Sequence, residues 1–177
     1  MFFKTYQGGV MDIKLKRLSK EAISAALDKA RQYRLLNESV EAESICLDVL
    51  EVEPDNQQAL IIMLLAVTDQ FVLELNPAFG NAQELLNRLC DGYCRSYYSG
   101  IIFERRAKVH LSRGGPGSGA VAYDWFRQAM EAYESAIEIR PSGNDEAILR
   151  WNTCARILKK HPELKPGHED REEHMLE

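Results

Sequence analysis

One spacing of residues occurs twice in this chain of 177 residues, and it restricts the possible folds more than any other feature. In each copy an alanine is followed by Cys or Tyr, then by Val or Ala, and finally by proline, at identical intervals. The two copies are Ala42, Cys46, Val49 and Pro54, and Ala129, Tyr133, Ala136 and Pro141. A buried small residue lets two helices approach closely, and proline does not continue a helix. The spacing therefore predicts a helical hairpin that is repeated along the chain.

Seven helical patterns follow one another, and none of the segments between them has the alternating pattern of a strand. The predicted helices span residues 19–36, 40–53, 56–75, 81–93, 99–111, 120–139 and 142–160. The third is apolar on nearly all sides, which is typical of a helix flanked by others, so we expect it at the centre of the core. Residues 76–80 are predicted to form a turn and the glycine-rich residues 114–119 a loop. Near the N-terminus, residues 2–6 are predicted to extend along a neighbouring element.

The duplicated spacing resembles the second helix of a tetratricopeptide repeat (TPR), in which a small residue, an aromatic residue, another small residue and a closing proline follow in this order. Ala30 and Tyr33 match the small residue and the tyrosine of the family's first helix. In the third unit Phe103, Ala107 and His110 stand at first-helix positions, and the glycine-rich loop lengthens that unit. The second unit departs most from the family pattern, because a leucine replaces the small residue and no proline closes the unit.

This resemblance implies an all-α fold, a right-handed solenoid of helical hairpins with about three TPR-like repeats and a C-terminal capping helix. The repeats would occupy residues 19–161, between an N-terminal extension at 1–18 and an acidic tail at 162–177. The residues expected to pack between helices are Ala30, Tyr33, Ala42, Cys46, Val49, Pro54, Ala107, Ala129, Tyr133, Ala136 and Pro141. A generic antiparallel helical bundle is the alternative, since it would also show amphipathic helices and short turns.

The composition argues against several classes of protein. The chain has 22 Lys and Arg against 27 Asp and Glu, a formal net charge of −5. Proteins that coat nucleic acids or bind anionic membranes carry a cationic excess instead. The most apolar run, residues 59–67, is much shorter than the roughly 20 residues that a membrane span needs. The first residues do not resemble a signal peptide, and the four cysteines follow no disulfide or zinc spacing. We therefore expect a reduced, cytoplasmic protein.

Several segments resemble known catalytic or binding motifs, but each lacks an essential residue. Gly114–Gly119 has the glycine spacing of a phosphate-binding loop without the lysine that follows it, and His168–His174 lacks the second histidine of a zinc-protease helix. Cys90 and Cys94 would share a helix face, but no second pair of ligands completes a metal site. For His110 the sequence places no acid or nucleophile nearby. We therefore predict no enzyme, no cofactor and no metal site.

In the TPR family the first helix of each hairpin lines a concave face that binds ligands. Carried over residue by residue, that face comprises Leu27, Arg31, Arg34, Ile61, Leu65, Ile101, Arg105 and Lys108, with Asp69 and Glu104 as acidic exceptions. This set describes an apolar floor with a cationic rim, beside an acidic second helix in the first repeat. The resemblance implies a non-enzymatic scaffold that binds a protein or peptide with acidic and apolar residues.

Other interpretations stay open at the level of the sequence. The arginines of the predicted face are equally consistent with an ordinary solvated helix surface. A helical protein that contacts RNA would bind phosphates through a set of cations, Arg31, Arg34, Arg105, Arg106 and Lys108. Most tyrosines, however, fall at packing positions rather than on a stacking platform. A homo-oligomer would associate through Phe2, Phe3 and Tyr6 or through the apolar second unit. The family's clamp for the C-terminal carboxylate of chaperones is disfavoured, because only Arg105 matches its set of Lys, Asn and Arg residues.

Overall fold

The computed structural model describes residues 14–73 and 75–167, and every regular element in these two segments is helical. The prediction of an all-α chain with seven α-helices and no strand is therefore confirmed for the described residues. The α-helices are α1 (Ile23–Leu35), α2 (Ser39–Val52), α3 (Gln57–Asp69), α4 (Leu75–Asn87), α5 (Gly92–Arg113), α6 (Ser118–Glu138) and α7 (Glu146–Lys160). Two short 3₁₀ helices, η1 (Lys20–Ala22) and η2 (Gln70–Val72), precede α1 and follow α3.

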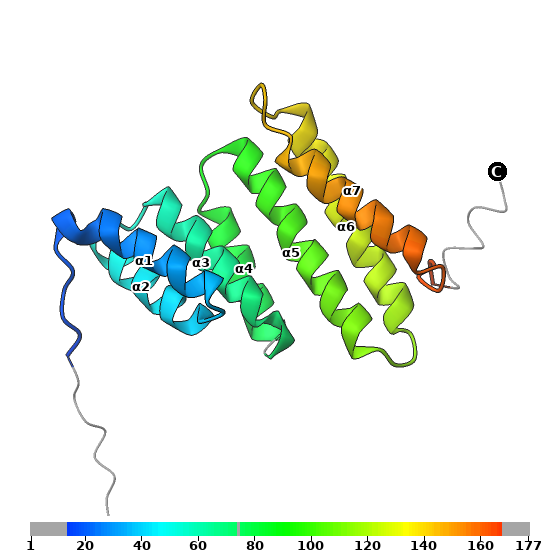
Figure 1. The fold of residues 1–177 in the computed structure, drawn as a ribbon, viewed down its shortest axis with the longest axis horizontal. Coiled ribbons are helices and arrows are strands. Elements are labelled where there is room, and N and C mark those ends of the chain that lie inside the picture. The colour runs from blue at the N-terminus through cyan, green and yellow to red at the C-terminus, as the bar shows by residue number, and fades with distance from the viewer. Residues whose placement is uncertain (1–13, 74, 168–177) are drawn as a thin grey trace, which may run out of the picture.

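The helices stand side by side in the order in which they occur along the chain (Figure 1). Each helix packs against the next one, and α1 also contacts α3. The hairpin of α1 and α2 consequently lies at one end of the row, and α6 and α7 lie at the other end. Because the main contacts join neighbours in sequence, the geometry of each hairpin is set largely by its own residues and by the adjacent helix.

Three groups of buried side chains form the core. The N-terminal cluster is built from α1, α2 and α3 around Leu27 and Cys46, and the central cluster from α3, η2, α4 and α5 around Leu64 and Phe71. The C-terminal cluster is built mainly from α5, α6 and α7 around Tyr133. Helix α3 contributes to the first two clusters, so its predicted place at the centre of the core is confirmed.

Most residues of the duplicated spacing lie at contacts between helices. Eight of the residues expected to pack between helices have no exposed surface: Ala30, Ala42, Cys46, Val49, Ala107, Ala129, Tyr133 and Ala136. Tyr33 is half-buried against the N-terminal cluster. The prolines Pro54 and Pro141 are exposed and follow the ends of α2 and α6, where they stop the helix without packing in the core.

The structure corrects the predicted boundaries around α4 and α5. Residues 76–80 are not a turn, because α4 already begins at Leu75. Pro77 is tolerated there, since the first N–H groups of a helix have no partner within the helix. Helix α5 begins at Gly92 rather than at residue 99, because Asp91 caps it: its Oδ1 accepts a hydrogen bond from the backbone N–H of Cys94 at 2.7 Å.

The two predicted flanking segments are only partly described. Residues 2–6 and 168–174, which carried the expected extension and the histidine pair, lie outside the described residues. Leu164 belongs to the predicted tail, yet it is buried in the C-terminal cluster, and Leu18 of the predicted extension packs on the N-terminal cluster. Within residues 14–73 and 75–167, no helix is both long enough and apolar enough to cross a membrane.

Candidate functional site

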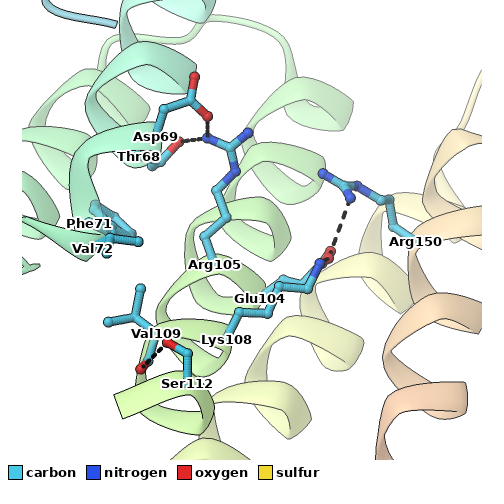
Figure 2. A pocket seen from close by; sticks show the side chains of 10 residues that line it. All are labelled: Thr68, Asp69, Phe71, Val72, Glu104, Arg105, Lys108, Val109, Ser112 and Arg150. Carbon is cyan, nitrogen blue, oxygen red and sulfur yellow. Dashed lines mark hydrogen bonds and ion pairs between the residues drawn. The ribbon is translucent and has the colours of Figure 1, made fainter. Parts of the chain in front are cut away.

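A cavity of about 430 Å³ opens between α3, η2 and α5, and α7 contributes one residue to it. Figure 2 shows that its side chains come from elements far apart in the sequence. Its lining residues are Thr68, Asp69, Phe71, Val72, Glu104, Arg105, Lys108, Val109, Ser112 and Arg150. Charged groups occupy one side of the cavity, and Phe71, Val72 and Val109 supply an apolar wall on the other.

Arg105 is held rigidly at the boundary between α5 and α3. Its Nη1 donates hydrogen bonds to the carbonyl of Leu65 at 2.9 Å and to Thr68 Oγ1 at 2.5 Å, and it pairs with Asp69 Oδ1 at 2.6 Å. The second oxygen of Asp69 accepts a hydrogen bond from Arg34 Nε at 2.7 Å. Burial lowers the pKa of Arg105, and the charge of Asp69 opposes that effect. One carboxylate therefore joins α1, α3 and α5.

Glu104 is a charged residue with no exposed surface. Tyr133 OH donates to Glu104 Oε2 at 2.7 Å, while Lys108 Nζ lies 2.5 Å and Arg150 Nη1 3.4 Å from Glu104 Oε1. Burial, followed by the charge of Glu104, raises the pKa of Tyr133 far above its usual value, so the hydroxyl stays protonated and keeps donating. These contacts satisfy the buried carboxylate from α5, α6 and α7.

The charges in and beside the cavity do not cancel. Four cations, Arg34, Arg105, Lys108 and Arg150, face two carboxylates, Asp69 and Glu104. The side chain of Lys108 is 42% exposed and that of Arg150 31% exposed, whereas Glu104 is hidden beneath them. The cavity therefore presents ammonium and guanidinium N–H groups to the solvent. Val72 and the neighbouring Leu73 are exposed beside them.

The structure brings together only part of the face predicted from the sequence. Arg105 and Lys108 line the cavity, Arg34 reaches it through Asp69, and Leu65 contributes a carbonyl group. Arg31 stays apart, since it pairs with Asp28 at 2.7 Å on the exposed side of α1.

The apolar floor is where prediction and structure differ. Leu27 and Ile101 are buried in the N-terminal and C-terminal clusters, and Ile61 packs half-buried against the central cluster. These side chains fill the contacts between adjacent helices, so the first helices do not present them to a ligand. The apolar wall is formed instead by Phe71, Val72 and Val109.

Sequence reasoning missed Arg150 as a site residue and assigned Tyr133 to packing alone. Arg150 lies 46 residues and Tyr133 29 residues from Glu104 in the sequence. Arg150 lies in an amphipathic helix, and nothing in the sequence pattern distinguishes it from a solvent-exposed arginine. The only indication for Glu104 was an acidic residue on a face that was otherwise cationic and apolar.

The other motifs do not assemble a reactive group in the described residues. Cys90 lies before α5 and Cys94 in its first turn, so they do not share one helix face as predicted. Burial raises the pKa of the Cys94 thiol to about 11, which disfavours the thiolate. Residues 14–73 and 75–167 contain no group of three or more His, Cys, Asp or Glu side chains arranged to hold a metal ion.

No family model, no curated protein and no solved structure matches this chain. What the cavity binds must therefore follow from its own geometry and charge. It combines fixed cations, partly exposed to solvent, with an apolar wall, and its own acidic groups are already occupied by ion pairs. This combination suits a ligand that carries both an anionic and an apolar group.

Proposed function

We propose that the protein is a non-enzymatic interaction module that binds an acidic and apolar peptide segment of a partner in the cavity between α3, α5 and α7. The observation that carries the proposal is the excess of partly exposed cations over carboxylates beside exposed Val72 and Leu73. In a peptide, a carboxylate followed by an apolar residue would occupy these two surfaces together.

We further propose that the helices form TPR-like hairpins, about three in a right-handed solenoid, with α7 as a cap. The burial of Ala42 and Cys46 on α2, and of Ala129 and Tyr133 on α6, supports this reading. In both hairpins the duplicated spacing occupies the contact with the preceding helix. The order of the helices along the row is also the one expected of stacked hairpins (Figure 1).

The ligand carboxylate is assigned to Lys108 and Arg150 because these cations retain N–H groups beyond those that contact Glu104. A Lys ammonium has three donors and an Arg guanidinium five, and each contacts Glu104 through a single nitrogen. Their partner Glu104 holds them in place from below, so little side-chain freedom is lost when a ligand binds. Arg105, by contrast, already donates to three acceptors and serves mainly to shape the wall.

The test places a negative charge at the mouth of the cavity without disturbing the ion pairs. Ser112 is exposed, lines the cavity, and its hydroxyl donates only to the carbonyl of Val109. Ser112→Glu should repel an anionic peptide and weaken its binding about tenfold or more, since like charges at an interface are costly. Ser135→Glu is the matched control, because Ser135 on α6 is exposed and donates to the carbonyl of Glu131 in the same way.

The probe is a displayed library of random peptides selected on the full chain, followed by calorimetry with the enriched peptide and its Asp→Asn and Glu→Gln counterparts. We expect enrichment of acidic residues next to apolar ones, loss of binding in the amide counterparts, and weaker binding at high salt. Enrichment of basic peptides, or equal binding to the Ser112→Glu and Ser135→Glu variants, would refute the proposal. Retention of RNA instead of peptides would favour the nucleic-acid alternative.

A further inference from the structure

Arg106, next to Arg105 in the sequence, points to a different face of α5 and packs against two aromatic rings. Its guanidinium carbon is 3.9 Å from the ring centroid of Phe79 on α4 and 4.3 Å from that of Trp125 on α6. The two rings contact each other edge to face, with centroids 5.6 Å apart. The two rings therefore meet at a corner and pack against the guanidinium from two adjacent sides, which restricts its orientation.

This cation has no counter-ion among residues 14–73 and 75–167. Its Nε is buried without a hydrogen-bond partner, and burial lowers the pKa of Arg106 with no carboxylate acting against that effect. One turn further along α5, His110 Nε2 is likewise buried without a partner. Burial and the charges of Arg106 and Arg113 lower the pKa of His110, which marks an unbalanced positive field at this place.

A guanidinium donates hydrogen bonds only in its own plane, through its edge. That edge offers paired N–H groups in one plane, the geometry that matches two oxygens of a carboxylate or a phosphate. A phosphate monoester carries about −1.5 to −2 charges at pH 7 and three acceptor oxygens. The uncompensated field of Arg106 and Arg113 favours this group over a single carboxylate, and the half-buried rings of Phe79 and Trp125 offer contact to the chain that carries it.

We propose that Arg106, framed by Phe79 and Trp125, is the anchor of a second binding surface, which takes a phosphorylated side chain of a peptide. This surface is separate from the cavity between α3 and α5, whose lining does not include Arg106. The proposal therefore goes beyond the proposed function and does not depend on it.

Trp125 provides the readout, because its indole ring touches the cation. In a Trp151→Phe chain, Trp125 is the remaining tryptophan, since the sequence contains two. Its fluorescence is titrated with a neutral peptide containing one phosphoserine, with the same peptide containing serine, and with inorganic phosphate. We expect saturable binding of the phosphopeptide, no binding of the serine peptide, and at least tenfold weaker binding of inorganic phosphate.

Arg106→Gln should weaken phosphopeptide binding at least tenfold, measured by calorimetry so that loss of the stacked cation does not affect the readout. Arg127→Gln is the control, because Arg127 on α6 is exposed and pairs only distantly with Glu131, 4.0 Å away. Arg106→Lys keeps the charge and removes the planar edge, so it should also bind several-fold more weakly; it decides the case if the Gln variant does not fold.

Three results would overturn the proposal. Unchanged binding in both Arg106 variants would make the arginine a packing residue. Equal binding of the serine and phosphoserine peptides would exclude phosphate recognition. Inorganic phosphate that binds as tightly as the phosphopeptide would make free phosphate, and not a phosphorylated partner, the ligand.

Discussion

At the scale of single residues, Glu104 has the most demanding environment of the described chain. Its carboxylate is fully buried and is matched by a hydroxyl from α6, an ammonium from α5 and a guanidinium from α7. Removing a charge from water costs several kcal/mol unless partners of good geometry compensate. Glu104 therefore stabilises the fold only as part of this set, and it also positions the two cations that face the cavity.

Glu104→Ala should lower the free energy of unfolding by about 3–5 kcal/mol, because it leaves Arg150 and Tyr133 without their buried partner. Glu134→Ala is a suitable comparison, since Glu134 also accepts a hydrogen bond from an aromatic side chain, Trp151 Nε1 at 2.9 Å, but at an exposed site. That variant should lose less than about 1 kcal/mol. Urea unfolding of both variants measures the difference, and similar losses would show that the Glu104 set contributes little.

The neighbouring cations show why charge reversal is a poor probe of this surface. Lys108 pairs with buried Glu104, and Arg34 pairs with Asp69. Replacing either by Glu would place two carboxylates together, partly out of water. Arg34 and Lys108 therefore have a structural role besides any contact with a ligand, and Ser112 is the cleaner position for a test.

At the scale of helices, the contact between α5 and α6 depends on one glycine. A Cβ atom built at Gly100 would lie less than 3.0 Å from three ring atoms of Tyr133. The ring cannot swing away freely, because its hydroxyl is bound to Glu104. Gly100 thus occurs in the interior of α5, where glycine is usually unfavourable, because the close approach of Tyr133 requires it.

Gly100→Ala should destabilise the protein by about 1–3 kcal/mol through overpacking. Gly80→Ala in α4 provides the opposite case, because a Cβ atom there meets nothing within 4 Å. That substitution should stabilise the protein by roughly 0.5–1 kcal/mol, since alanine restricts the unfolded chain more than glycine does. Thermal unfolding of the two variants checks the prediction, and a stabilising Gly100→Ala would mean that α5 and α6 are not packed as closely as described.

At the scale of the whole molecule, helices α2 and α7 lie near opposite ends of the row (Figure 1), and each carries one buried thiol, Cys46 on α2 and Cys154 on α7. Burial raises the pKa of each from an ordinary value of 9.0 to about 12. The charge of Glu43 adds to the effect at Cys46, and that of Glu104 adds to it at Cys154. Each thiol therefore keeps its proton in the folded state at a pH where the unfolded chain releases it.

Because the unfolded state binds fewer protons than the folded state between pH 9 and pH 12, the free energy of unfolding should fall as the pH rises above 9. Each thiol contributes up to about 1.4 kcal/mol per pH unit to this fall in the free energy of unfolding. If the row of helices unfolds as one unit, Cys46→Ala and Cys154→Ala should each reduce the pH dependence of the free energy of unfolding in the same unfolding transition. Urea unfolding from pH 8 to 10 tests this, with Cys90→Ala as the exposed control. A slope that neither variant changes would contradict the prediction.

Local patterns along the sequence were sufficient to predict the class of the fold and the order of the seven helices. Helical periodicity and end signals act over a few residues, and they can be recognised without knowledge of the rest of the chain. The duplicated spacing also predicted close helix contacts at Ala42, Cys46, Ala129 and Tyr133, and all four residues are completely buried. Helix starts were missed where competing signals occur, as at Asp91, which caps α5 eight residues before the predicted start at residue 99.

Which charged side chains meet depends on how the helices pack, and it could not be predicted from local patterns. Arg105 and Lys108 could be assigned to one face from their positions on a helix, but Arg150 reaches Glu104 from α7 and Asp69 joins Arg34 to Arg105 across three helices. The adjacent residues Arg105 and Arg106 have different environments: Arg105 belongs to an ion-pair network, whereas Arg106 packs against two aromatic rings. The physical reason is that local pattern sets where a helix forms, whereas burial and charge depend on the distance and rotation between helices, which packing across the whole row determines.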